Sequence, residues 1–156
     1  MAERFGAGVA GKAGTNTADT VMFELRATAA TVRLRVLQIV VAVQSAPSTA
    51  PVFYLTRASA NGTSSTTLVG QPIDSADPTS LATFDSAWSA APTITAANKI
   101  DVGPVPVTAG STWVFSFWDE PLVLQASTTA GGLCIVNSPA TGATTGTFAA
   151  SARWIE

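Results

Sequence analysis

Short apolar runs separated by turn residues are the feature that most constrains the fold of this chain. Residues 31–36 alternate strictly between polar and apolar side chains, which is typical of a strand with one buried face. Similar runs recur along the chain, with Gly, Pro, Asn and Asp clusters between them at intervals of roughly eight to twelve residues. No segment is a convincing helix. The sequence therefore predicts an all-β protein, a jelly-roll-like antiparallel β-sandwich of about 8–10 strands.

The phase of the alternation changes between Val36 and Leu37. Residues 37–43 carry their largest apolar side chains on the opposite parity from residues 31–36. Either a β-bulge or burial of both strand faces would explain this change. Because Val40 and Ala42 are also apolar, we favour burial of both faces, with another subunit as the second cover.

Three further segments carry specific expectations. Pro104 and Pro106 exclude residues 99–107 from a central strand and predict an edge strand. Residues 81–88 are expected to form a strand, with a short helix as the alternative. Residues 119–121, of sequence Asp-Glu-Pro, predict a polar hairpin turn between two apolar strands.

The first twenty residues differ in composition from the rest of the chain. Residues 1–20 contain mainly Gly, Ala, Thr and Asn, with few side chains large enough to bury much surface. We expect a flexible N-terminal arm over residues 1–20 that reaches a neighbouring subunit. The remaining residues, 21–156, are long enough for one β-sandwich domain with a core of its own.

The chain is poor in groups for catalysis. It has no histidine, and only 12% of its residues are charged. Its single cysteine, Cys134, lies in an apolar run and is expected to be a small buried side chain, since a catalytic thiol needs an adjacent base. Asp119 and Glu120 are adjacent on alternating faces, and Asp74 and Asp77 lack the dense acidic pattern of a calcium loop. We therefore expect no catalytic residue, no metal site and no cofactor.

Charge and hydropathy also bear on possible partners. The eight basic residues are scattered and the formal net charge is −2, so the chain offers little to neutralise phosphates. The longest strongly apolar run, residues 37–43, is far shorter than a bilayer span, and the N-terminus does not resemble a signal peptide. We expect neither nucleic-acid binding nor membrane insertion.

Aromatic side chains are the remaining candidates for a binding site. The four tryptophans could form a sugar-stacking platform, but a core face with one aromatic subunit contact explains their positions without a ligand. We favour core or interface positions. The residues expected at contacts between chains are Phe5, Val40, Trp118 and Trp154.

A resemblance to a known class of proteins rests on four parts of the sequence. The first is the sequence of residues 30–39, which is typical of a strand. The second is an Ala-Pro loop followed by residues 52–63. The other two are residues 106–113 and the closing Trp-Ile-Glu of residues 154–156. In these the chain resembles small structural proteins of tailed bacteriophages, namely jelly-roll (TNF-like) capsid decoration or minor virion proteins.

The resemblance implies a function without catalysis. It implies a homo-oligomer, commonly a trimer, that is made in the host cytoplasm and binds the major capsid protein on the capsid surface, where it stabilises the shell. Two alternatives remain at this point. One is a receptor- or glycan-binding module of a phage fibre or spike. The other is a secreted signalling trimer of the TNF or C1q type, which the absence of a signal sequence disfavours.

Overall fold

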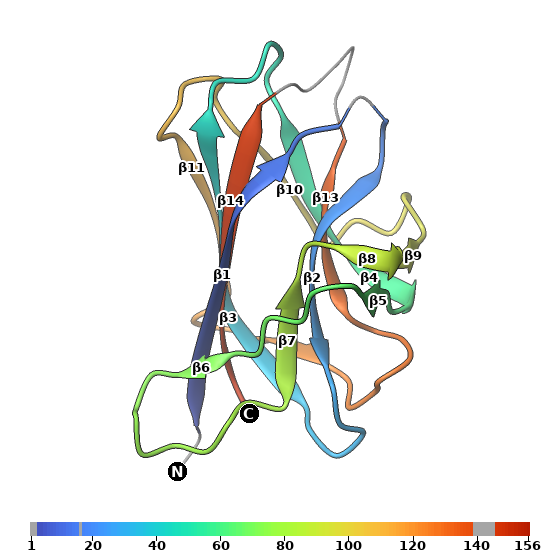
Figure 1. The fold of residues 1–156 in the computed structure, drawn as a ribbon, viewed down its shortest axis with the longest axis vertical. Coiled ribbons are helices and arrows are strands. Elements are labelled where there is room, and N and C mark those ends of the chain that lie inside the picture. The colour runs from blue at the N-terminus through green and yellow to red at the C-terminus, as the bar shows by residue number, and fades with distance from the viewer. Residues whose placement is uncertain (1–2, 16, 139–145) are drawn as a thin grey trace.

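The computed structural model describes residues 3–15, 17–138 and 146–156, which form two facing antiparallel sheets (Figure 1). Sheet A contains, in spatial order, β6 (Gln71–Pro72), β1 (Arg4–Ala13), β14 (Thr147–Ile155), β3 (Leu34–Ser45) and β11 (Thr112–Ser116), and β12 (Leu122–Leu124) also pairs with β3. Sheet B contains β7 (Ala82–Asp85), β2 (Thr20–Ala27), β13 (Leu133–Asn137), β4 (Val52–Ala60) and β10 (Asp101–Pro104), and β9 (Thr93–Ile94) pairs with β4. The short strands β5 (Thr63–Ser64) and β8 (Trp88–Ala90) pair only with each other.

The path of the chain between the sheets confirms the predicted fold class. The long strands β1, β2, β3 and β4 lie alternately in sheets A and B, and β13 and β14 follow the same rule (Figure 1). Each strand that crosses over pairs with strands distant in sequence, as β14 does with both β1 and β3. The described residues contain no helix. The protein is therefore an all-β, jelly-roll-like sandwich.

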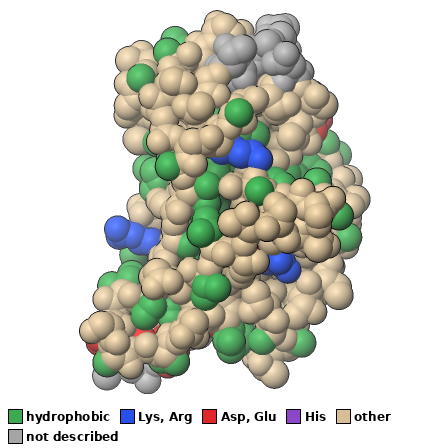
Figure 2. All heavy atoms as spheres, in the orientation of Figure 1, with side chains coloured by type: hydrophobic (Ala, Val, Ile, Leu, Met, Phe, Trp, Pro, Cys, Tyr) green, Lys and Arg blue, Asp and Glu red, His purple; other side chains and the backbone are tan. Residues whose placement is uncertain are grey.

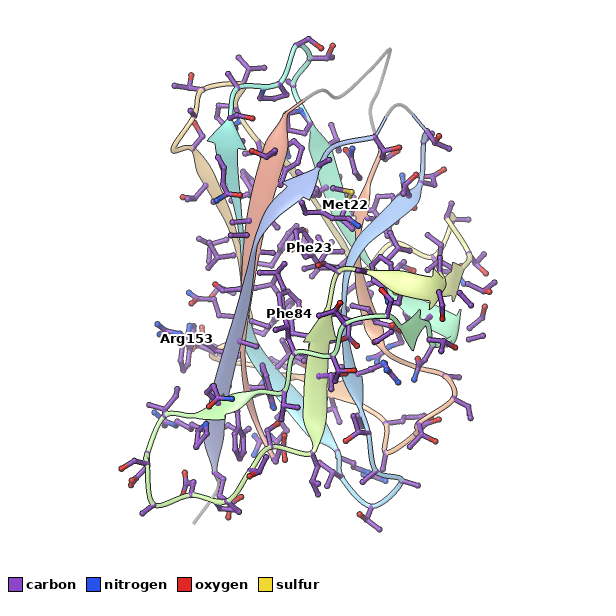
Figure 3. The ribbon with its side chains drawn as sticks, in the orientation of Figure 1. Met22, Phe23, Phe84 and Arg153 are labelled. Carbon is purple, nitrogen blue, oxygen red and sulfur yellow. The ribbon has the colours of Figure 1, made fainter. Side chains whose placement is uncertain are left out.

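The main core lies between the sheets and is rich in aromatic rings. Phe53 of sheet B meets Phe148 of sheet A edge to face at 5.2 Å between ring centroids, so this pair joins the two layers. Phe23 stacks on Phe84 at 5.8 Å within sheet B. Figure 3 shows both of these rings, with Met22, pointing into the space between the sheets. Burial of these rings supplies much of the apolar contact that holds the layers together.

The phase change in β3 is a β-bulge. On β14, Arg153 lies opposite Gln38, whereas the next residue, Trp154, lies opposite Val36. Leu37 is thus the extra residue, and the strand changes its inward parity there. Val40 is only half-buried on the outer face, and no described residue covers it. The bulge accounts for the change of phase, and cover of the outer face by another subunit stays a prediction.

The N-terminal segment differs from the expected flexible arm. Residues 4–13 form β1, which pairs with β14 along almost its whole length, from Arg4 opposite Ile155 to Ala13 opposite Thr147. Phe5 is fully buried and stacks on Trp154 at 6.2 Å. The segment has few large side chains of its own. It is ordered by backbone pairing with β14 and by burial of the Phe5 ring. Residues 1, 2 and 16 of the expected arm lie outside the described part of the chain.

The edges of the sandwich agree with the proline pattern but not with the predicted hairpin. The segment with Pro104 forms β10 at the edge of sheet B, and residues 82–85 form a strand, both as predicted. Residues 117–121 do not reverse the chain, because β11 and β12 pair one after the other with the same edge of β3. The segment between them is therefore a loop that interrupts one edge strand opposite the bulge.

One glycine lets the two edges approach each other. A Cβ atom on Gly103 of β10 would lie 2.0 Å from Nε1 of Trp113, which extends from β11. Only glycine leaves room for the indole ring to lie against the backbone of the other sheet. This contact closes the side of the sandwich where β10 and β11 meet.

We expect Phe5→Ala to destabilise the protein by about 3–5 kcal/mol, because it leaves a cavity beside Trp154. Val107→Ala, at a side chain that is 42% exposed, is the control and should change stability by about 0.5 kcal/mol or less. Urea unfolding of the two variants and the wild type measures both values. Equal stabilities of Phe5→Ala and wild type would mean that the N-terminal segment is an unpacked arm after all.

Candidate interaction surface

The two outer faces of the sandwich differ in how they are covered. On sheet B, Trp88 and Ile94, from the segment over β8 and β9, pack against a second apolar cluster. The strand residues of this cluster are Val21, Tyr54, Ala58, Cys134 and Val136. The outer face of sheet B is therefore covered by the protein's own chain.

The outer face of sheet A is uncovered within the described part of the chain. Its central side chains are small. In one row across the strands, Gly8 of β1 lies opposite Ser151 of β14, and Ser151 lies opposite Val40 of β3. Val114 of β11 continues this row and is 45% exposed. A face with small and branched apolar side chains at its centre is typical of surfaces that another protein covers.

A shallow groove runs over the middle of this face. It has a volume of about 280 Å³ and lies where β1, β14 and β3 meet. Its lining residues are small or apolar: Gly8, Val9, Ala10, Val40, Ala42, Ala149, Ala150 and Ser151. The groove exists because these small side chains leave the sheet surface low. It can accept apolar side chains of a partner, and it holds no group for acid–base chemistry.

The structure separates the four residues expected at contacts between chains. Phe5 and Trp154 are fully buried in the main core, and the Nε1–H of Trp154 donates to Glu156 at 3.0 Å. They were wrongly assigned to an interface, because neither side chain reaches the surface. Val40 lines the groove, and Trp118 is 46% exposed on the loop between β11 and β12. Those two remain predictions.

The four tryptophans do not come together as a platform. Trp154 is in the main core, and Trp88 packs into the second cluster on sheet B. Trp113 is half-buried, packs on the main core and meets Phe115 edge to face at 6.4 Å. Of the four, only Trp118 is exposed, at 46%. A sugar site that needs several parallel exposed rings is therefore not assembled in the described chain.

A buried polar cluster on sheet B was missed by sequence reasoning. Glu24 of β2 lies opposite Asp85 of β7, and both side chains are fully buried. Arg26 donates from Nε to Asp85 Oδ2 at 3.3 Å, and its Nε lies 3.8 Å from Glu24 Oε2. The backbone N–H of Gly62 donates to Glu24 at 3.1 Å, and that of Leu68 donates to Asp85 at 3.3 Å.

This cluster fastens the segment around β5 to sheet B. Asp85 also accepts hydrogen bonds from Ser64 and Thr83, so its oxygens are occupied by protein donors. Burial raises the pKa of Glu24 to about 7, against the lowering effects of the Gly62 N–H and the Arg26 charge. The carboxylates are held by the chain rather than presented to a substrate. The only sequence signal for this buried cluster is the carboxylate of residue 24 between large apolar side chains.

The remaining candidates for chemistry are few. The thiol of Cys134 is buried in the second cluster, and burial raises its pKa, so little reactive thiolate forms. Asp74 accepts from the backbone N–H of Ala76 in an exposed turn. Within the described ranges, no three acidic or cysteine side chains lie close enough to hold a metal ion. The same part of the chain has no helix with the length and apolarity needed to span a membrane.

Comparison with known proteins returned no match to a family model, to a curated protein or to a solved structure.

Glu24 makes stability depend on pH. Because its pKa rises from 4.5 to about 7 on folding, the folded state binds more protons than the unfolded chain between these values. Its contribution is therefore fully present below pH 4.5 and is lost as the pH rises through about 7, a change on the order of 3 kcal/mol. The stability of wild type relative to Glu24→Gln should fall by that amount from pH 4.5 to pH 8 in urea unfolding. A constant difference would contradict the assignment.

Proposed function

We propose that this protein is a non-enzymatic structural component of a virion, a decoration protein that binds the outside of a phage head and stabilises the shell. The observation that carries the proposal is the contrast between the two sheets. The outer face of sheet B is covered by the protein's own chain, whereas the apolar outer face of sheet A is open. An open face of this kind suits a protein whose task is to lie against others.

The physical basis for stabilisation is mass action. A protein that binds the assembled shell, and not its separated subunits, shifts the equilibrium toward assembly by an amount set by its concentration relative to its Kd. Several copies joined in one oligomer would bind adjacent shell subunits together and gain from effective concentration. A trimer would supply three identical sheet A faces in a symmetric arrangement.

A glycan- or receptor-binding module is the second candidate. Trp118 favours it, since its ring is 46% exposed beside the exposed carboxylates of Asp119 and Glu120. A single ring supports weaker sugar binding than a platform of several, so this candidate has less support than shell binding.

Light scattering and co-sedimentation with expanded empty phage capsids test the proposal directly. We expect a solution mass of three times the 15.9 kDa chain and saturable binding to the capsids. A monomer that does not bind capsids would overturn the proposal. In that case, quenching of Trp118 fluorescence by glycans would test the second candidate.

Two matched variants test which outer face of the sandwich binds the capsid. Val40→Glu places a charge beside the groove, and Val102→Glu places the same charge on β10, where Val102 lies opposite Tyr54 on the outer side of sheet B. We expect Val40→Glu to weaken capsid binding at least about tenfold, because the carboxylate would be desolvated in an apolar contact. Val102→Glu should bind like wild type. Equal binding by the two variants would exclude the groove.

A further inference from the structure

Three arginines lie together on the outer face of sheet A, at the end nearest both termini. Arg4 of β1 and Arg35 of β3 both lie opposite Ile155 of β14, and Arg153 precedes Ile155 by two residues on the same face. With one strand between them, the Cα atoms of Arg4 and Arg35 are about 10 Å apart. All three side chains are exposed. Figure 3 shows Arg153 pointing away from the interior of the sandwich.

These three side chains, here called the arginine cluster, have no ion pair and no hydrogen bond with any other described residue. Four of the five other basic side chains have partners, whereas the exposed Arg33 makes no ion pair or hydrogen bond with a described residue. Arg26 pairs with Asp85, Arg57 donates to the Val123 carbonyl at 2.9 Å, Lys12 donates to the Ser86 carbonyl, and Lys99 lies over the Tyr54 ring at 4.6 Å. The arginine cluster is therefore not needed to hold the fold.

The arginine cluster adjoins the groove. Arg153 lies opposite Gly6 on one side and Gln38 on the other. Ser151, two residues before Arg153 on β14, lines the groove. One face thus carries an apolar half and a cationic half. In the view of Figure 2 the visible Lys and Arg side chains lie apart from one another, and one of them projects from the left edge, on the side of sheet A.

Size indicates that the two halves are used together. The four longest-paired strands of sheet A, at about 4.8 Å spacing, and the nine residues of β14, at about 3.4 Å each, give a face of about 600 Å². A stable contact buries about 800 Å² on each partner. The groove alone is too small, so a partner on this face covers the arginine cluster as well.

Charge then restricts the partner. Covering three arginines with an apolar surface would leave desolvated charges without partners, which is strongly unfavourable. A two-fold contact of this face with a second copy would bring two arginine clusters together and is disfavoured by repulsion. Nucleic acid would engage the arginines but not the apolar groove, and a chain of net charge −2 repels a polyanion at longer range. A protein surface with carboxylates beside small apolar side chains satisfies both halves.

We propose that the outer face of sheet A is the shell-binding surface, and that it binds an acidic segment of the shell subunit. The carboxylates of that segment pair with Arg4, Arg35 and Arg153, and its apolar side chains enter the groove. This inference rests on the proposed function and specifies the chemistry of the partner.

The test compares two charge reversals. The double variant Arg35→Glu/Arg153→Glu alters the arginine cluster, and Lys99→Glu reverses a charge on the sheet B side as the control. Binding to expanded empty phage capsids is measured by co-sedimentation from 50 to 500 mM NaCl, and folding is checked by thermal unfolding. Arg153→Gln and Arg153→Lys provide milder changes if the double variant unfolds.

We expect wild type and Lys99→Glu to bind alike and to weaken as salt increases. The double variant should lose about 100-fold in affinity at 50 mM NaCl and show little further salt dependence. Arg153→Lys should bind closer to wild type than Arg153→Gln does.

Failure of the inference and failure of the proposed function give different results. If wild type does not bind capsids, the proposed function fails. If wild type binds and the double variant binds equally at every salt concentration, the function stands and the acidic partner is excluded. If the double variant instead loses oligomeric mass, the occupant is a second copy. Binding of wild type to DNA that the double variant loses would also overturn the proposal.

Discussion

The structure depends on the position of β14 between β1 and β3. Its inward side chains, Phe148, Ala150, Ala152 and Trp154, alternate with outward ones, so a single strand contributes to the core along its whole length. Trp154 buries the ring of Phe5 against it, and Phe148 meets Phe53 across the sandwich. The C-terminal strand therefore orders the N-terminal one, and both ends of the chain are held in one sheet.

The outer faces then acquire opposite characters from the path of the chain. The long excursion between β4 and β10 returns over sheet B, where Trp88 and Ile94 complete an apolar cluster and Glu24, Arg26 and Asp85 fasten β5. No described segment makes a similar return over sheet A. The open face with its groove and arginine cluster follows from this asymmetry, and the proposed role in shell binding makes use of it.

Local patterns predicted most of the elements but not their neighbours. Alternation in residues 31–36 and the prolines of residues 99–107 each predicted a strand that the structure contains, although the first begins only at Leu34. Residues 4–13 could not be recognised as a strand, since their order comes from pairing with a segment about 140 residues later and from the single ring of Phe5. The buried Glu24 was hidden for a similar reason, because its partners come from β7 and from the loop after β4.

The sequence by itself determined the strand periodicity, the all-β class, the change of phase at Leu37 and the scarcity of groups for catalysis, since each of these is a property of side-chain type and spacing along the chain. The tertiary structure decided which explanation of the phase change holds, which outer face is covered, and which exposed side chains lie together. Arg4, Arg35 and Arg153 are far apart in sequence, and only the pairing of β1, β14 and β3 places them on one face. Neighbouring strands are set by long-range hydrogen bonding and packing, and no local pattern encodes the partner.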